Sequence, residues 1–158
     1  RLPDYWVVEI SGLPFGVTSE MLNYQDGGNP YRGMLYGMSG RLNVTAPSMW
    51  EFWDKFGIQQ TEMIGYWEKN CPVKTDNKNI LATVYKKKGK TLVSIGSWAK
   101  NDTNISLKIN WKALGLNPAN TKIEASYIKV FQQEKTFVVG DKIPVEAGKG
   151  LLLVLENK

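Results

Sequence analysis

The sequence predicts a mainly β protein, with an antiparallel β-sandwich as its C-terminal domain. Before the sandwich we expect an α/β segment resembling the last strands and helix of a (β/α)8 barrel. From about residue 60 onward, short strand-like runs alternate with turn residues, as in all-β domains. Before Gly57 the order is strand, long loop, strand and helix, which is the order of (β/α) units. We therefore expect two parts: residues 1–57 as the terminal part of a barrel, and residues 58–158 as the sandwich.

The first part opens on Tyr5–Ile10, a nearly continuous apolar run of the kind that is buried on both faces of a parallel sheet. A loop rich in Gly, Asn and Pro follows over residues 11–32. Gly33–Met38 then fits a second short buried strand. Two such units cannot close a barrel by themselves, because a barrel needs eight.

A helix is predicted next. Thr45 or Ser48 can cap its N-terminus, Pro47 suits its first turn, and Gly57 fits the position after its end. Its apolar residues recur at i, i+3, i+4 and i+7 and so form one stripe. These residues are Met49, Phe52, Trp53 and Phe56.

The β-sandwich is predicted from the spacing of its strand-like runs. Lys88 and Gly89 form a turn that joins two of them into a hairpin, and a short helical turn closed by Gly115 is expected between Trp111 and Leu116. The strand candidates are Glu62–Trp67, Ile80–Lys86, Thr91–Trp98, Asn104–Asn110, Lys122–Val130, Thr136–Val139, Lys142–Val145 and Leu151–Glu156.

The absence of histidine narrows the chemistry that this sequence allows. It excludes a Ser-His-Asp triad, a Cys-His dyad and a His-ligated zinc site within the chain. Cys71 is alone, so it has no partner for an intrachain disulfide. We expect no metal and no cofactor, and any acid–base work falls to carboxylates, Lys or Tyr.

The net charge of +5 comes mainly from lysine, since only Arg1, Arg32 and Arg41 are arginine. The densest basic run, Lys86–Lys90, lies between two predicted strands and is interpreted as a solvated hairpin tip rather than a phosphate-binding patch. We expect no nucleic-acid partner. The longest apolar run, Leu151–Leu155, is far short of the ~20 residues of a membrane-spanning helix.

The loop over residues 11–32 is the most informative stretch for function. If Tyr5–Ile10 is a barrel strand, the loop leaves its C-terminal end, where barrel active sites lie. Carboxylate, amide, phenol and guanidinium groups together suit sugar hydroxyls. For Glu20, substrate contact and a structural role in bracing the loop are equally compatible with the sequence. For Asp26, a place in a turn is favoured over a role in a glycosidase carboxylate pair. The candidate substrate-binding residues are Glu20, Asn29, Tyr31 and Arg32.

Some tryptophans are candidates for a carbohydrate platform. Trp67 and Trp98 end predicted strands near loops, where a flat ring can face a sugar. Core packing is the commoner role of tryptophan. Trp53 is expected to have this role, because it belongs to the apolar stripe of the predicted helix. We therefore favour packing for these rings.

Several motifs resemble the C-terminal region of bacterial glycoside hydrolases similar to family 123, a group of N-acetylhexosaminidases and their relatives. In the first part these are Glu9–Gly16, Glu20–Leu22, Gly28–Gly37 and Trp50–Ile58; in the second part, Ile64–Trp67, Ala82–Tyr85, Trp111–Leu116 and Ala147–Gly150. The resemblance implies a barrel followed by a β-sandwich, a secreted or periplasmic location, and cleavage of a glycosidic bond. It also implies that the substrate's acetamido group is the nucleophile, assisted by an adjacent Asp-Glu pair.

This chain departs from that pattern in having no Asp-Glu dipeptide. The catalytic carboxylates are therefore expected upstream of Arg1, and the chain is expected to be a C-terminal piece of the hydrolase that is inactive alone. Its partners would be the remainder of the barrel and an oligosaccharide or glycan substrate. The alternative is a stand-alone carbohydrate-binding or adhesive module, which predicts that Trp67 or Trp98 faces solvent.

Overall fold

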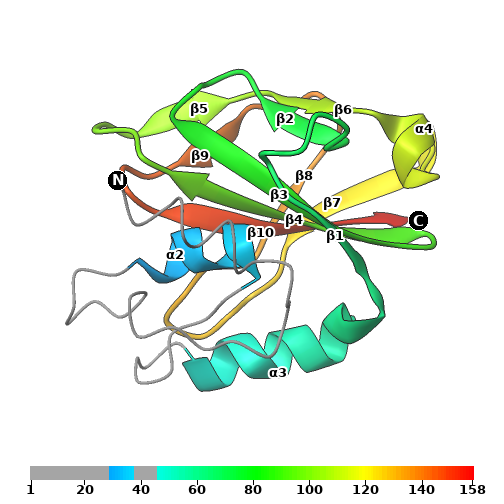
Figure 1. The fold of residues 1–158 in the computed structure, drawn as a ribbon, viewed down its shortest axis with the longest axis horizontal. Coiled ribbons are helices and arrows are strands. Elements are labelled where there is room, and N and C mark those ends of the chain that lie inside the picture. Colours follow the sequence, from blue (N-terminus) through cyan, green and yellow to red (C-terminus); the bar gives the residue numbers. More distant parts are fainter. Residues whose placement is uncertain (1–28, 38–45) are drawn as a thin grey trace.

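The computed structural model describes residues 29–37 and 46–158 (Figure 1). Helical elements come first, and the rest is mainly strands with two short helical turns between Ile109 and Thr121. In chain order the elements are α2 (Pro30–Gly33), the 3-10 turn η3 (Met34–Tyr36), α3 (Ala46–Phe56), η4 (Ile58–Gln60), β1 (Glu62–Ile64), β2 (Val73–Thr75), β3 (Ile80–Lys87), β4 (Lys90–Ser97), β5 (Thr103–Ile105), β6 (Leu107–Ile109), α4 (Trp111–Leu114), η5 (Pro118–Asn120), β7 (Thr121–Ala125), β8 (Lys135–Phe137), β9 (Ile143–Val145) and β10 (Gly150–Asn157).

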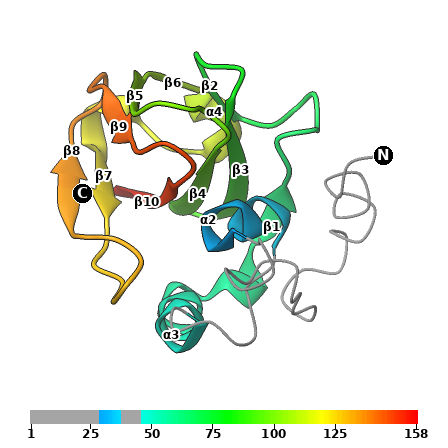
Figure 2. The ribbon, with the colours of Figure 1, turned by 90° about the vertical axis from the view of Figure 1, so that its left-hand side faces the viewer.

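The strands form two layers, as predicted for a β-sandwich. One layer is a six-stranded sheet in the order β1-β3-β4-β10-β7-β8, and each neighbouring pair is antiparallel. The other layer consists of two antiparallel pairs, β2-β6 and β5-β9 (Figures 1 and 2). The predicted hairpin joins β3 to β4 through Gly89, whose φ of 73° suits the turn.

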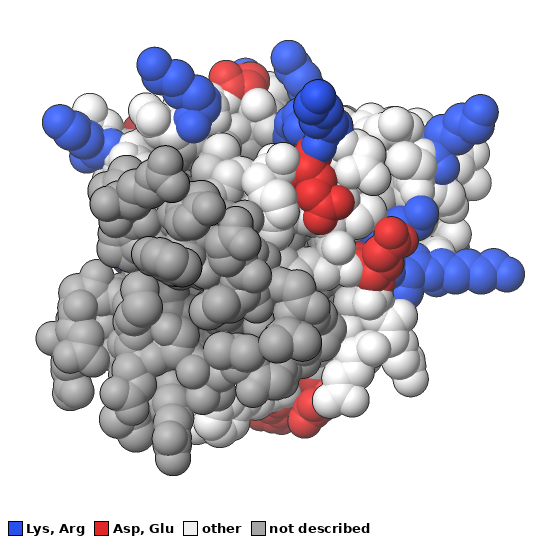
Figure 3. All heavy atoms as spheres, in the orientation of Figure 1, with Lys and Arg blue, Asp and Glu red and all other residues white. Residues whose placement is uncertain are grey.

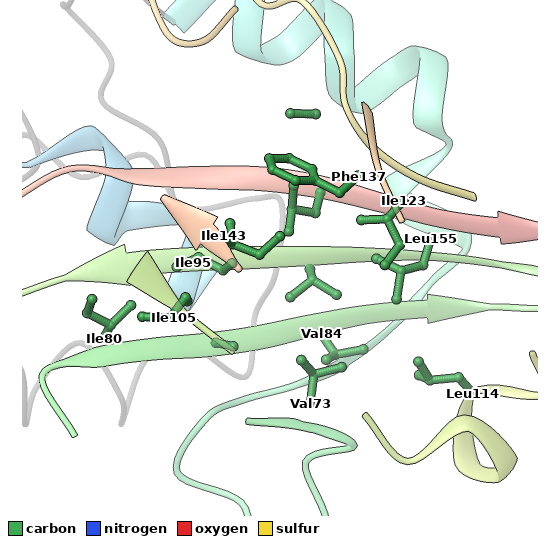
Figure 4. Close-up of a cluster of buried hydrophobic side chains, with 14 of the residues drawn as sticks. Val73, Ile80, Val84, Ile95, Ile105, Leu114, Ile123, Phe137, Ile143 and Leu155 are labelled. Atoms are coloured by element: carbon green, nitrogen blue, oxygen red, sulfur yellow. The ribbon is translucent and has the colours of Figure 1, made fainter. Parts of the chain in front are cut away.

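The main core fills the space between these layers. Alternate residues of the long strands, such as Val84 and Ile95, point into it and meet side chains of the second layer, such as Ile105 and Ile143 (Figure 4). All four are at most 1% exposed. Burying each such side chain contributes about 1.5–3 kcal/mol, so the alternation along β3, β4, β7 and β10 sets the sandwich register.

The outer face of the six-stranded sheet is also covered. Helix α3 and the α2–η3 segment lie against it on the side away from the second layer (Figure 2). Tyr85 and Leu92 on this face are 0% exposed and pack with Met34, Met49 and other residues of the two segments. The central strands are therefore buried on both faces, which explains why most of their residues are apolar and why even their threonines and serines are buried.

Helix α3 confirms the prediction made from its apolar stripe. Met49, Trp53 and Phe56 are 2%, 7% and 3% exposed and face the sheet, while Phe52 is half-buried beside them. The helix ends at Phe56, and Gly57 follows with a left-handed φ of 75°.

The predicted buried strand Gly33–Met38 is wrong, because residues up to Tyr36 are helical. An apolar run of this length does not distinguish a strand from a helix by periodicity alone. Asn29 and Pro30 settle it here, since they form an N-cap and a first helical residue. Tyr5–Ile10, the other predicted barrel strand, lies outside the described residues.

Other strand predictions inside the sandwich were also inaccurate, since the strands predicted over Glu62–Trp67 and Lys122–Val130 end at Ile64 and Ala125. The run Asn104–Asn110 forms two strands, β5 and β6, which pair with different partners. The break is at Ser106, whose backbone exchanges hydrogen bonds with Asp76 instead of a neighbouring strand. Strand β2 was not predicted, because Val73–Thr75 is too short to show alternation.

Candidate functional site

Asn29 fixes the start of the α2–η3 segment. Its side-chain oxygen accepts hydrogen bonds from the backbone N–H groups of Tyr31, at 3.0 Å, and Arg32, at 3.1 Å. Its amide nitrogen donates to the Gly148 carbonyl at 2.6 Å. One side chain therefore caps α2 and ties it to the turn before β10.

Two hydroxyl groups on the sheet hold the next turn of the segment. The Thr83 hydroxyl donates to the Leu35 carbonyl at 2.8 Å, and the Tyr85 hydroxyl donates to the Met34 carbonyl. Burial raises the pKa of the Tyr85 phenol above its ordinary value, so the group stays a protonated donor. These buried polar groups on an otherwise apolar sheet face are satisfied by the backbone of the segment.

A glycine pair lies in the sheet at this contact. Gly96 of β4 and Gly150 of β10 are paired in register. A Cβ atom on Gly96 would lie 2.6 Å from Leu35 Cδ1, and one on Gly150 would lie 1.9 Å from the Ile95 carbonyl oxygen. The absence of a side chain at Gly96 lets Leu35 rest on the sheet backbone, and its absence at Gly150 lets β10 approach the backbone of β4.

Arg32 anchors the segment at the end of β4. Its Nε donates to the Ser97 carbonyl at 3.1 Å, and its guanidinium carbon lies 4.5 Å from the centre of the Trp98 ring. A guanidinium over an indole face is a favourable cation–π contact. The half-buried Trp98 is thus occupied on one face by Arg32.

An aromatic cluster lies next to this anchor. The Tyr36 ring stacks on Trp67 at 5.9 Å between centres, and the hydroxyl oxygens of Tyr36 and Tyr66 are 3.1 Å apart. Tyr66 meets Trp67 edge-on at 5.1 Å. Tyr36 is 2% exposed and both partners are half-buried, so the cluster seals the edge of the segment against the sandwich.

Tyr31 borders a cavity of about 460 Å³. Its ring stacks on Phe131 at 4.6 Å, and the two rings form part of an apolar wall. Glu134, Lys135 and Glu146 line the same cavity and supply acceptors and donors. Aromatic and polar groups in one concave site suit a sugar ring, which has an apolar face and a hydroxyl edge.

Comparison with known protein families matches two consecutive parts of the chain to two domain families. Residues 45–156 match the glycoside hydrolase 123 C-terminal domain, and residues 1–43 match the glycoside hydrolase 123 TIM-barrel domain. The chain belongs to glycoside hydrolase family 123. No curated protein and no solved structure matches it.

The matched ranges give the contacts above a clear meaning in this family 123 chain. The segment Asn29–Gly37 lies within the barrel-domain match, whereas Thr83, Tyr85 and Gly96 lie in the C-terminal-domain match. The site is therefore a junction at which the sandwich holds part of the barrel domain. The domain boundary that we place between residues 57 and 58 stays a prediction.

The candidate sugar-binding residues have different surroundings in the structure. Tyr31 borders the cavity, while Asn29 caps α2 and Arg32 bridges Ser97 and Trp98. Glu20 and Asp26 lie outside the described residues. Direct contact of these residues with a substrate stays a prediction. Sequence reasoning did not single out Phe131 for the cavity, and an isolated phenylalanine in a turn carries no signal for that role.

The thiol of Cys71 has a structural role in this chain. It is 5% exposed and lies 3.4 Å from the Val73 carbonyl oxygen, with the Ile64 and Ala82 carbonyls at 3.6 Å. Burial raises its pKa, so the group is a protonated thiol at neutral pH and a poor nucleophile.

Charge and hydropathy add two observations. On the face shown in Figure 3, the lysine side chains stand apart around the sandwich, whereas nucleic-acid binding favours a concentrated basic surface. Within residues 29–37 and 46–158, no helix is long and apolar enough to cross a membrane.

Proposed function

We propose that this chain is the C-terminal part of a secreted or periplasmic glycoside hydrolase. In that enzyme it contributes part of the sugar-binding face and an accessory β-sandwich. The catalytic carboxylates come from barrel residues upstream of Arg1, so the chain is inactive alone. Its working partners are the remainder of the barrel and a glycan substrate.

The observation that carries this proposal is the buried contact between the two matched domains. A barrel segment is held through its own backbone carbonyls by Thr83 and Tyr85, two side chains of the sandwich. Such contacts fix backbone position, since moving the segment leaves buried polar groups without partners. These contacts support the proposal that the sandwich holds the neighbouring barrel residues in position.

The sugar-binding part of the proposal rests on residue type and place. Asn29, Tyr31 and Arg32 lie at the end of the stretch 11–32, within the barrel match, and Tyr31 lines a cavity with both apolar and polar walls. Glu20 joins them on the grounds of sequence alone. Residues that position a substrate lower the activation barrier of the reaction that catalytic groups elsewhere in the barrel carry out.

The test combines the mass of the native polypeptide with its activity. We expect the polypeptide in its source to be several-fold heavier than 17.8 kDa and to hydrolyse a chromogenic N-acetylhexosaminide. The 158-residue chain is expected to leave that substrate intact. A native mass of 17.8 kDa with a cooperative melt would overturn the proposal in favour of a stand-alone binding module, and hydrolysis by the 158-residue chain would place catalytic groups within it.

A further inference from the structure

A second hollow lies on the outer face of the six-stranded sheet, between α3 and the loop that joins β7 to β8. Figure 2 shows this loop descending below the sheet beside α3. The groove between them has a volume of about 610 Å³, which is within the ~300–1,000 Å³ of small-ligand sites. We call it the α3 groove. Its lining comes from α3, β4, β7, β10 and residues 126–129.

Apolar and aromatic groups form one part of this lining. Phe56, Ile128 and Val154 are buried at 3%, 3% and 7% exposure, and Phe52 is half-buried beside Phe56. Tyr127 also lines the groove but is 57% exposed. A large exposed ring beside a concave apolar surface is free to stack on a ligand that enters the groove.

The charged groups of the lining cancel one another. Four of the charged groups form two ion pairs, Lys55 with Glu51 at 3.0 Å and Lys90 with Glu156 at 3.3 Å. The chain as a whole carries +5, so the balance is a local property of the groove. The lysines of the lining are Lys55, Lys90 and Lys129, and the glutamates are Glu51, Glu124 and Glu156.

This balance favours a neutral ligand with many hydroxyl groups. A polyanion gains little here, because three glutamates of the lining oppose its three lysines; two of these glutamates pair with a lining lysine, and Glu124 pairs with the neighbouring Lys122. Carboxylates accept hydrogen bonds from hydroxyls, and ammonium groups donate to them. Pyranose chains combine such hydroxyl edges with apolar faces that suit aromatic rings.

The loop wall is held in place before any ligand binds. Gln132, 8% exposed, donates to the Ser126 and Leu152 carbonyls at 2.7 and 3.0 Å and accepts from the Leu152 N–H at 2.8 Å. Val130, which lies between Ser126 and Gln132 in the chain, has a φ of 66°, which is strained for a β-branched residue. Strain of this kind persists only where the surroundings enforce it, and it is concentrated at ligand-binding loops.

We propose that the α3 groove is a binding subsite for a neutral pyranose oligosaccharide, with Tyr127 as its stacking residue. The inference rests on the proposed function, since a glycan-cleaving enzyme supplies the setting in which such a ligand is met. It extends that function by adding a second glycan contact on the sandwich, next to α3 rather than next to Tyr31. Preorganisation of the loop by Gln132 lowers the entropic cost of that contact.

The experiment titrates the 158-residue chain with neutral tetrasaccharides, cellotetraose and the β1,4-linked N-acetylglucosamine tetramer, by calorimetry. We expect at least one to bind, and Tyr127→Ala to weaken that binding at least tenfold. A tenfold loss equals about 1.4 kcal/mol, which is the size of one aromatic contact. Tyr127→Phe keeps the ring and should therefore bind within about twofold of the unchanged chain. Val138→Ala is the matched control, since Val138 is 66% exposed and does not line the groove.

Three outcomes would overturn the inference. They are no binding of either tetrasaccharide, binding that Tyr127→Ala leaves unchanged, and tighter binding of an anionic heparin tetrasaccharide than of the neutral ones. None of these bears on the proposed function, which is tested by the mass and activity of the native polypeptide. Hydrolysis by that polypeptide with no Tyr127-dependent binding would therefore remove the subsite and leave the function standing.

Discussion

The Thr83 hydroxyl donates a hydrogen bond of 2.8 Å to the Leu35 carbonyl, across 48 positions of the chain. Both residues are 0% exposed, so the contact is out of reach of water. It links a strand of the C-terminal domain to a segment of the barrel-domain match. Thr83 also accepts from the Tyr66 backbone N–H at 3.2 Å, which ties the neighbouring aromatic cluster to the same hydroxyl. One small polar side chain thus organises the junction.

Thr83→Val should lower the free energy of unfolding by about 1–3 kcal/mol. Valine keeps the shape of threonine but leaves the buried Leu35 carbonyl without its donor. Chemical denaturation of the 158-residue chain measures the change. Thr83→Ser is the control, because it retains the hydroxyl and should lose less. An unchanged stability in Thr83→Val would show that the carbonyl finds another partner.

Gly96→Ala should destabilise the junction by about 1–3 kcal/mol, because the new methyl group overlaps the Leu35 side chain. Leu35→Ala alone should cost about 2–5 kcal/mol through the cavity it leaves. In the double variant the methyl group added at position 96 enters space that the leucine side chain has vacated. The combined loss, measured by chemical denaturation, should therefore be smaller than the sum of the single losses by about 0.5–3 kcal/mol. Strict additivity would mean that the two residues do not touch.

The sequence predicts some of these features well and others poorly, for identifiable reasons. Helix α3 carries its stripe on residues three and four apart, a period that only a helix gives. The sandwich strands show turns at regular spacing, and Gly89 marks their hairpin. By contrast, α2–η3 owes its shape to the cap at Asn29 and to the sheet beneath it, which an apolar run of six residues does not reveal.

The junction itself was hidden from sequence reasoning. A threonine inside a strand is usually interpreted as facing solvent, yet Thr83 faces a backbone carbonyl of a distant segment. Gly96 similarly indicates a weak point in a strand, while its function is to admit Leu35. Both roles depend on a tertiary contact between parts of the chain that local patterns do not connect. Asn29 is different, since the pair Asn-Pro is a local start signal for a helix.

Ser94→Ala should raise the free energy of unfolding by about 1 kcal/mol. The Ser94 hydroxyl is buried and, within the described residues, has no hydrogen-bond partner, so its removal relieves a desolvation cost. For a chain of this size the increase corresponds to about 2–4 °C in the melting temperature. Ser97→Ala on the same strand is the matched control. This substitution should be destabilising, because the Ser97 side-chain oxygen, Oγ, accepts a hydrogen bond from the Ala99 backbone N–H at 3.0 Å.

Asp76 should make stability depend on pH in the acid range. The Ser106 backbone N–H, which donates to Oδ1 at 2.9 Å, and the nearby Lys142 ammonium hold the pKa of this carboxyl below its ordinary value of 3.8. A carboxyl whose pKa is depressed by folding contributes stability above its unfolded pKa. That stability is lost as pH falls through the folded pKa. The urea midpoint should therefore fall as pH drops below about 4, and Asp76→Asn should flatten that part of the profile.

Lys142→Gln separates the two causes of the Asp76 shift. Because the Ser106 hydrogen bond is the largest single cause, the variant should keep a substantial part of the acid sensitivity that Asp76→Asn removes. The contribution of Lys142, an ion pair at 3.4 Å on an exposed surface, should weaken in high salt. If Lys142→Gln flattens the profile as fully as Asp76→Asn does, the ion pair rather than the backbone contact controls the carboxyl. The break between β5 and β6 would then owe little to the charge on Asp76.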